Sequence, residues 1–315
     1  MKSLISIYSQ KTEIERIKQS GLLPGSFFDE EERDGINVSR ELKSIWAVEL
    51  DLLNEFDRVC KKYNLRYYAF GGTLLGAVRH HGFIPWDDDI DVAMPMEDYK
   101  LIQEIAQKEF IHPYKLQTPY LDKGSYFSFM KLRNENTTFM SKVYSAQQFN
   151  QGAFIDIFPL VECPPDKVKE QRDKIFPSIM RCSNYMKRGC ESMLNEQQME
   201  RYKVFYTDTP LAEYEKIITE FDNPDYRGCG YYTHASLFFN RDEYHVWKSS
   251  LWSDVIDWPF ENMEVPIPFG WESIMEEYYG DYMQLPALEK RVSNHSDMII
   301  DMENPYKLYI KQNSK

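Results

Sequence analysis

The sequence has little of what marks secreted, membrane-spanning or nucleic-acid-binding proteins. No stretch approaches the roughly 18 apolar residues that a membrane-spanning helix needs, and the N-terminus lacks the apolar segment of a secretory signal. The five cysteines are an odd number without a CxxC pair, which favours reduced thiols. A formal net charge of −13 argues against nonspecific binding to nucleic acid or anionic membrane, because both depend on surplus Lys and Arg. We expect a cytoplasmic protein that meets a membrane only through a partner or a lipid-linked acceptor.

The composition is that of a folded protein with a sizeable core. Of the 315 residues, 43% are hydrophobic and 15% are aromatic, and the chain has no repeat and no low-complexity linker. We predict an N-terminal arm over residues 1–38, a catalytic core over 39–160, and a helical and aromatic-rich part over 161–315 packed on that core.

Hydrophobic periodicity predicts interleaved helices and strands in the first half. Ser39 can cap an amphipathic helix that ends near Asn64, and a second helix is expected over about 97–109. Strand-like runs lie at residues 66–70, 90–94, 114–117, 126–132 and 153–158. Residues 164–220 read as mostly helical and residues 231–268 as aromatic-rich with β-like character. The fold class is therefore α+β, with a mixed sheet flanked by helices.

The strongest chemical signal begins with Gly71-Gly72-Thr73 between a strand and a short helix. Two glycines let the backbone approach a ligand, and the following helix turns its free N–H groups toward that point, which suits a phosphate. Asp89 and Asp91 follow on an expected strand, where alternation places both carboxylates on one face. Paired carboxylates repel each other unless a cation lies between them, and hard oxygen ligands favour Mg²⁺ or Mn²⁺.

Asp156 supplies a third carboxylate inside the apolar run Phe154–Phe158. A buried, unpaired carboxylate costs several kcal/mol, so this one is expected to have a cation or a hydrogen-bond partner. Together, Asp89, Asp91 and Asp156 can orient an attacking hydroxyl and stabilise the leaving oxygen of an in-line displacement at phosphorus. We assign Asp87 to the same metal, either as a ligand from the loop or as a neighbour that contacts the metal-binding groups, and we expect Asp88 to be solvated.

Three basic residues are candidate phosphate ligands. Lys131 and Arg133 alternate on a β-like run and hence share a side, where they could neutralise donor phosphates. The alternative is a surface strand paired with nearby acids. Arg79 follows the glycine helix and could reach the same phosphates or form a salt bridge with the acid cluster.

Several segments together closely resemble the LicD family, which includes bacterial phosphocholine transferases and fukutin-related proteins. The resemblance covers about residues 40–160 and 255–295 and is carried by the following segments: Gly71–His80, Phe83–Asp91, Lys131-Leu132-Arg133 with Thr137-Thr138, Phe154–Leu160, and Tyr279–Pro286. Two positions depart from the usual family pattern, Ala287 where a second proline is common and Asn294 where many members carry His.

The resemblance implies a nucleotidyltransferase-like fold. It also implies metal-dependent transfer of phosphocholine, or a related phospho-group, from a CDP-linked donor to a hydroxyl of a cell-surface glycan or lipid-linked sugar. It further raises Arg291 and His295 as phosphate or acceptor contacts. Two other functions remain open at this stage. An Asp-x-Asp glycosyltransferase would use the same carboxylates against a nucleotide-sugar, and a binding protein could retain the fold without catalysis.

Overall fold

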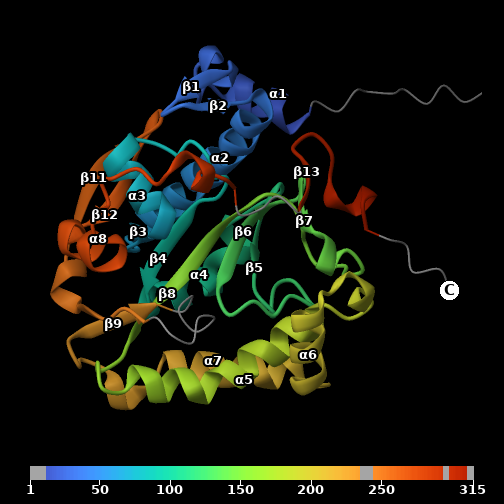
Figure 1. The fold of residues 1–315 in the computed structure, drawn as a ribbon, viewed down its shortest axis with the longest axis vertical. Coiled ribbons are helices and arrows are strands. Elements are labelled where there is room, and N and C mark those ends of the chain that lie inside the picture. The colour runs from blue at the N-terminus through green and yellow to red at the C-terminus, as the bar shows by residue number, and fades with distance from the viewer. Residues whose placement is uncertain (1–11, 235–243, 294–297, 311–315) are drawn as a thin grey trace, which may run out of the picture.

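The computed structural model describes residues 12–234, 244–293 and 298–310, and its centre is a seven-stranded mixed sheet (Figure 1). One path through the sheet runs β10–β9–β8–β4–β3, and β6 and β5 continue from β8. The strands span β3 Tyr68–Ala69, β4 Asp91–Pro95, β5 Tyr114–Gln117, β6 Met130–Asn134, β8 Phe154–Glu162, β9 Tyr231–His234 and β10 Trp247–Lys248.

Strand β8 organises this sheet because its nine residues are long enough to pair with three neighbours. It runs parallel to β4 on one edge, whereas β6 and β9 pair antiparallel with its first and last parts. Every residue of β8 except Glu162 is buried. The predicted α+β class with a mixed sheet is thus confirmed.

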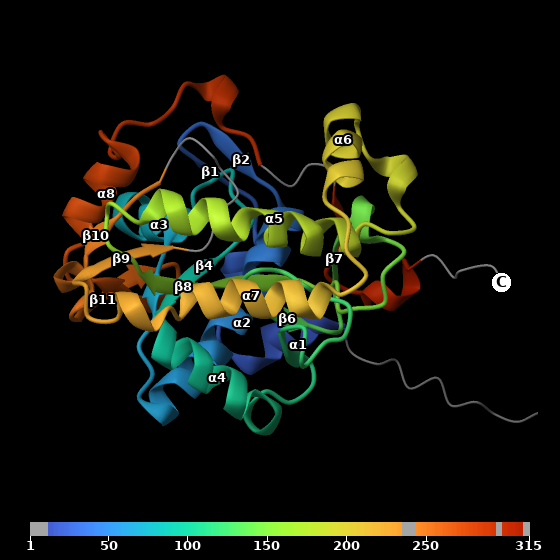
Figure 2. The same cartoon turned by 90° about the horizontal axis from the view of Figure 1, so that it is seen from below.

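Helices pack around the central sheet. In Figure 2, α5 and α7 run side by side across the molecule. The helices span α1 Glu13–Ser20, α2 Arg40–Tyr63, α3 Gly71–His80, α4 Met96–Glu109, α5 Val168–Met186, α6 Glu196–Val204, α7 Pro210–Phe221 and α8 Trp271–Tyr279. Helix α2 begins where expected, since the Ser39 hydroxyl accepts the Leu42 N–H, and Asn64 ends it in a left-handed conformation.

Three two-stranded pairs lie outside the central sheet. They are β1 Glu31–Arg33 with β2 Ile36–Val38, β11 Val255–Phe260 with β12 Met263–Pro268, and β7 Thr138–Ser141 with β13 Met298–Asp301. The β11–β12 pair agrees with the β-like character predicted for the aromatic-rich segment. The sequence did not predict the pairing of β7 with β13, whose partners lie about half the chain apart.

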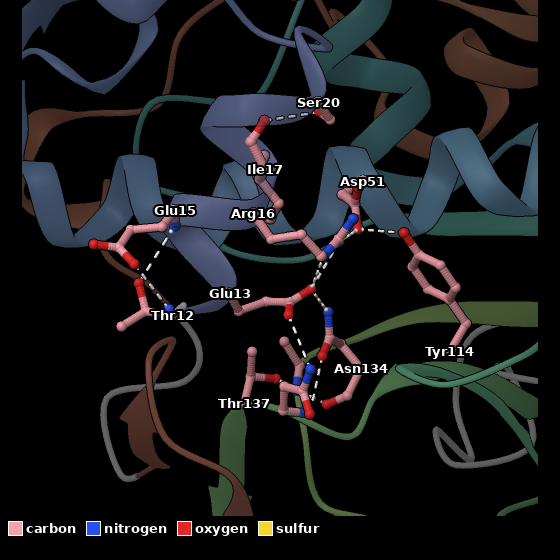
Figure 3. Close-up of polar contacts among 12 residues, drawn as sticks. Thr12, Glu13, Glu15, Arg16, Ile17, Ser20, Asp51, Tyr114, Asn134 and Thr137 are labelled. Atoms are coloured by element: carbon pink, nitrogen blue, oxygen red, sulfur yellow. Dashed lines mark hydrogen bonds and ion pairs between the residues drawn. The ribbon is translucent and has the colours of Figure 1, made fainter. Parts of the chain in front are cut away.

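The segment before α2 is tied to the core by polar contacts (Figure 3). Arg16 on α1 binds Glu13 and pairs with Asp51 on α2, and the Tyr114 hydroxyl donates to the same Asp51 carboxylate. The Asn134 amide donates to Glu13 at 2.7 Å. Helix α1 is therefore joined to α2, to β5 and to β6. The division of the chain at residues 38 and 160 stays a prediction.

Two general expectations concern thiols and membrane spans. All five cysteines are free, as predicted. Across the described ranges, no helix combines the length and the apolar character needed to cross a membrane.

Candidate active site

The glycine pair begins α3 in direct contact with the acidic segment. Gly71 has a φ of +53°, a conformation that L side chains rarely adopt, and a Cβ built there would lie 3.0 Å from Asp91 Oδ2. A Cβ on Gly72 would lie 2.8 Å from Asp87 Oδ2. The Thr73 hydroxyl accepts the Asp91 N–H at 2.8 Å and so fixes α3 to the start of β4. The two glycines thus leave room for two carboxylates against the backbone.

Asp91 and Asp156 occupy directly opposed positions of the parallel strands β4 and β8. On the other side of β8, Lys131 is opposite Asp156 in the antiparallel register, and its Nζ donates to Asp156 Oδ1 at 2.5 Å. Lys131 and Asp156 are 6% and 8% exposed, so the pair is largely buried, as the apolar run around Asp156 predicted. Burial lowers the pKa of Lys131 and the Asp156 carboxylate opposes that effect. The Lys131 ammonium group is therefore a partner of the kind expected for Asp156.

The loop before β4 places its acids differently from the sequence prediction. The strand begins at Asp91, so Asp89 lies in the loop, and its assignment to the strand was wrong. Asp88 is only 5% exposed and accepts a hydrogen bond from the Ser293 hydroxyl at 2.9 Å, so it is not a solvated residue. An Asp-Ile-Asp sequence alternates in the same way in a strand and in an extended loop. The sequence pattern therefore could not show that Asp89 precedes the strand.

Burial and mutual repulsion both disfavour the ionised carboxylates of this cluster. Burial, then the charges of Asp89 and Asp88 and a hydrogen bond with Asp89, raise the pKa of Asp87 to about 8. Burial, Asp89 and Asp156 likewise raise the pKa of Asp91 well above its ordinary value. Each of these carboxylates would be stabilised by a nearby cation.

Glu49 on α2 is a sixth acid of this region, and the sequence reasoning missed it. Its side chain is fully buried, and among the described residues neither carboxylate oxygen has a hydrogen-bond partner. Burial first, and then the charges of Asp89 and Asp88, raise its pKa well above the ordinary value. The nearby Trp46 indole donates to the Asp87 carbonyl at 2.8 Å, which joins α2 to the acidic loop. A signal was available, since Glu49 interrupts the otherwise mostly apolar run 45–53.

The donor chemistry of the cluster suits a hard divalent cation, because the side chains offer only carboxylate oxygens beside a glycine turn without Cβ atoms. In the side-chain arrangement described, however, no three His, Cys, Asp or Glu residues of the described ranges converge closely enough to hold a metal ion. The predicted ligands are Asp87, Asp89, Asp91 and Asp156.

Arg133 lies beside Lys131 but makes other contacts. It is 4% exposed, and its guanidinium donates to Gln117 Oε1 and to the Gly152 carbonyl, both at 2.6 Å. Both basic side chains lie over the ring of Phe154. The surface-strand alternative is therefore wrong for the pair. Of the two, Lys131 is the one that contacts a predicted catalytic carboxylate.

Arg79 and Arg291 belong to a second group, at the far end of α3. Arg79 is eight positions after Gly71, about 12 Å along the helix axis, and it donates to the Tyr282 carbonyl at 2.9 Å. Arg291 donates to the Asp34 carbonyl at 2.6 Å and lies over the ring of Trp86. Arg79 lines a hollow of about 620 Å³, which Arg33, Asp34 and His80 also line.

This second group is joined to the acidic loop through the Ser293–Asp88 hydrogen bond. His80 Nδ1 lies 3.0 Å from Asp34 Oδ2, and burial and the Arg79 charge lower the pKa of His80 to about 4, so the imidazole is neutral at pH 7. His295 was predicted to accompany Arg291, and it lies outside the described residues.

Comparison with known proteins places this region in a family. Residues 64–178, which contain the glycine turn and all the predicted metal ligands, match the family model described as LicD/FKTN/FKRP, nucleotidyltransferase domain. The chain is 27% identical over 259 residues to the lipopolysaccharide cholinephosphotransferase LicD of Haemophilus influenzae, covering 78% of this chain and 92% of that protein.

Two shorter matches have higher identity. The chain is 44% identical over 54 residues to the uncharacterized protein RP689 of Rickettsia prowazekii, which covers 17% of this chain and 20% of that one. It is 48% identical over 51 residues to the human ribitol 5-phosphate transferase FKRP, which covers 16% of this chain and 10% of FKRP. Residues 64–178 are therefore a LicD-family domain, as the sequence resemblance predicted.

Proposed function

We propose that this protein is a phosphotransferase that moves phosphocholine, or a related phospho-group, from a CDP-linked donor to a hydroxyl of a glycan or lipid-linked sugar. The observation that carries the proposal is the opposition of Asp91 and Asp156 on adjacent parallel strands, beside a glycine turn that faces Asp91 and Asp87. The similarity to a cholinephosphotransferase and, over a short segment, to a ribitol phosphate transferase supports the reaction class. The family description supports a nucleotidyltransferase-like fold.

In the proposed reaction, an acceptor hydroxyl oxygen attacks the phosphorus that carries the transferred group. A new phosphorus–oxygen bond forms, the bond to the oxygen of the CMP phosphate breaks, and CMP leaves with that electron pair. Asp156 is the proposed group that receives the hydroxyl proton, either directly as general base or through a shared metal. Lys131 holds one oxygen of Asp156 and thereby fixes the direction of the carboxylate.

A divalent cation, Mg²⁺ or Mn²⁺, is part of the proposal. When bound, it would neutralise charge on the phosphates. Asp87, Asp89, Asp91 and Asp156 are the residues that would hold it, and the raised pKa values of Asp87 and Asp91 support a need for positive charge at this position. Arg79 and Arg291 are proposed to contact the donor or acceptor phosphates from the second group of residues.

The experiment is product analysis with a panel of activated donors. The purified chain is incubated with Mg²⁺ or Mn²⁺, a glycan acceptor extract, and CDP-choline, CDP-ethanolamine, CDP-ribitol or UDP-sugars. We expect CMP and a phosphodiester-linked product, with no product from Asp91→Asn. Release of UDP with a new glycosidic bond would favour the Asp-x-Asp glycosyltransferase, and the absence of any product would favour a binding protein.

A further inference from the structure

An aromatic pocket lies on the face of β8 that also carries Asp156, since Phe158 lines it. It has a volume of about 310 Å³ and is formed by the segment before β6, by β8 and by α5. Its aromatic lining residues are Tyr126, Phe127, Phe129, Tyr144 and Phe158. Of the rings, Tyr126, Phe127, Phe129 and Tyr144 are only partly buried, whereas Phe158 is buried. The run 126–129, which was predicted to be strand, is irregular and turns these rings into the pocket.

The register of the sheet fixes the distance between this pocket and the acid. Phe158 follows Asp156 by two positions on β8, so both side chains lie on one face, about 7 Å apart along the strand. Phe129 lies just before β6, two positions ahead of Lys131, and its ring packs against Phe158 with centroids 4.5 Å apart. A short chemical spacer would therefore be enough to join a phosphorus atom held at Asp156 to a group held by the rings.

The rings form a cup. Phe129 and Phe158 are tilted by 42°, and Phe127 meets Tyr144 edge to face at 86°. A flat nucleobase is best held between parallel ring faces, whereas a compact, rounded cation is best held by several inclined faces at once.

The fold already places one cation on these same faces. Lys131 Nζ lies 5.3 Å from the centroid of the Phe127 ring and 5.1 Å from that of Phe129, within the range of cation–π attraction. Its charge is compensated by Asp156, which reduces its repulsion of a second cation at these rings. The pocket lining itself contains no Lys or Arg.

We infer that this pocket, through Phe127, Phe129, Tyr144 and Phe158, is the subsite that selects the transferred group by binding a quaternary ammonium ion. The inference rests on the proposed function, because it assumes that the phosphate lies beside Asp156. A trimethylammonium group on a two-carbon spacer matches the distance of about 7 Å along β8 between Asp156 and Phe158. A polyol would leave its hydroxyls against aromatic carbon, which is costly for unsatisfied polar groups.

Binding measurements with a charge-free analogue test the inference. The ligands are CDP-choline, CMP, and the CDP ester in which a carbon replaces the quaternary nitrogen, each measured by calorimetry. The wild-type chain should bind CDP-choline about tenfold more tightly than the carbon analogue, the size expected for a desolvated cation–π contact. Phe127→Leu should abolish that difference and leave CMP affinity unchanged. Phe127→Tyr, which keeps the ring, should retain the difference.

The controls and the remaining outcomes distinguish failure of the ammonium subsite from failure of the proposed CDP-linked donor. Phe269→Leu, at an exposed ring outside the pocket, is the control and should change no affinity, and melting temperatures check that each variant folds. Equal affinity of wild type for CDP-choline and the carbon analogue overturns the ammonium subsite, and an equal loss for CMP assigns the pocket to the base. If wild type binds no CDP compound, the proposed donor fails. Tetramethylammonium then tests the pocket by itself. It should raise the melting temperature of wild type but not that of Phe127→Leu, and any other result overturns the subsite as well.

Discussion

Asp91 and Asp156 are opposed in the parallel register of β4 and β8, although 65 positions separate them in the sequence. Adjacent parallel strands bring the two carboxylates to one row of the sheet, and Lys131 continues that row on β6. One row of three charged side chains thus crosses three neighbouring strands. With all three groups ionised, two negative charges face one positive charge, and an added cation would stabilise that state.

Asp156→Asn tests the catalytic role of this row. Loss of a positioned base should lower kcat by about 10²–10⁴-fold. The same change leaves Lys131 buried without its carboxylate, and breaking a buried ion pair in this way costs about 3–5 kcal/mol of stability. The measurement is kcat, donor affinity and melting temperature for the single variant.

A double variant separates the two effects of that substitution. Lys131→Met with Asp156→Asn removes both charges, so it should recover much of the lost stability while turnover remains low. Recovery of turnover together with stability would mean that Asp156 is structural and that the base is another group.

Cation dependence should appear in stability as well as in activity. Mg²⁺ or Mn²⁺ that binds only the folded chain should raise the free energy of unfolding by about 2.7 kcal/mol at a concentration of 100 times its Kd. Asp91→Asn should remove both the activity and this increase, and in EDTA its melting temperature should equal or exceed that of wild type, because a repulsive charge is gone. Full turnover of wild type in excess EDTA would contradict the metal requirement.

The sequence was sufficient for the parts of the site that depend on local pattern. Apolar neighbours placed Asp156 in a buried strand, and the glycine pair marked the start of α3. It was not sufficient where burial depends on distant segments. Glu49 is an acid within a helix, and only the packing of the acidic loop against α2 shows that it belongs to the site.

The same limit explains the placement of the basic residues. Arg79 is close to the glycine turn in sequence, but the rise of an α-helix carries it to the opposite end of α3, where it meets Tyr282. Alternation correctly put Lys131 and Arg133 on one side of β6. It could not show that only Lys131 contacts Asp156, since Gln117 and Gly152, which hold Arg133, come from other segments.

Gly72→Ala tests the close approach of the glycine turn to the acids. The added Cβ would lie 2.8 Å from Asp87 Oδ2, so this carboxylate must move, while the helical position itself accepts alanine. We expect a loss of activity of about 10²-fold, the size that misplacement by about 1 Å can produce, with stability changed by less than about 1 kcal/mol. Gly25→Ala is the matched control, because its Cβ would have no atom within 4 Å. Equal activities of the two variants would show that the position of Asp87 is unimportant.

Glu49 predicts how stability depends on pH in the absence of divalent cations. Its pKa in the folded chain lies well above the ordinary value of 4.5, and the pKa of Asp87 is about 8. Between the ordinary and the raised values, the folded state keeps protons that the unfolded state has lost. The free energy of unfolding therefore falls as pH rises from about pH 5 toward the Asp87 pKa of about 8, by at most about 1.4 kcal/mol per pH unit for each such group.

Glu49→Gln removes one of these groups and should make the decline shallower without abolishing it, because Asp87 still titrates. Denaturant unfolding in EDTA at several pH values between about 5.5 and 8.5 measures the slope. Glu104→Gln, on the exposed side of α4, is the control for the loss of one negative charge. Glu49→Gln should also be more stable than wild type at the highest pH values of this range. There, the folded wild type must either bury an ionised Glu49 or keep it protonated, and both cost free energy. A slope identical to that of wild type would mean that Glu49 is ionised and compensated in solution, and its placement against the acidic loop would then be wrong.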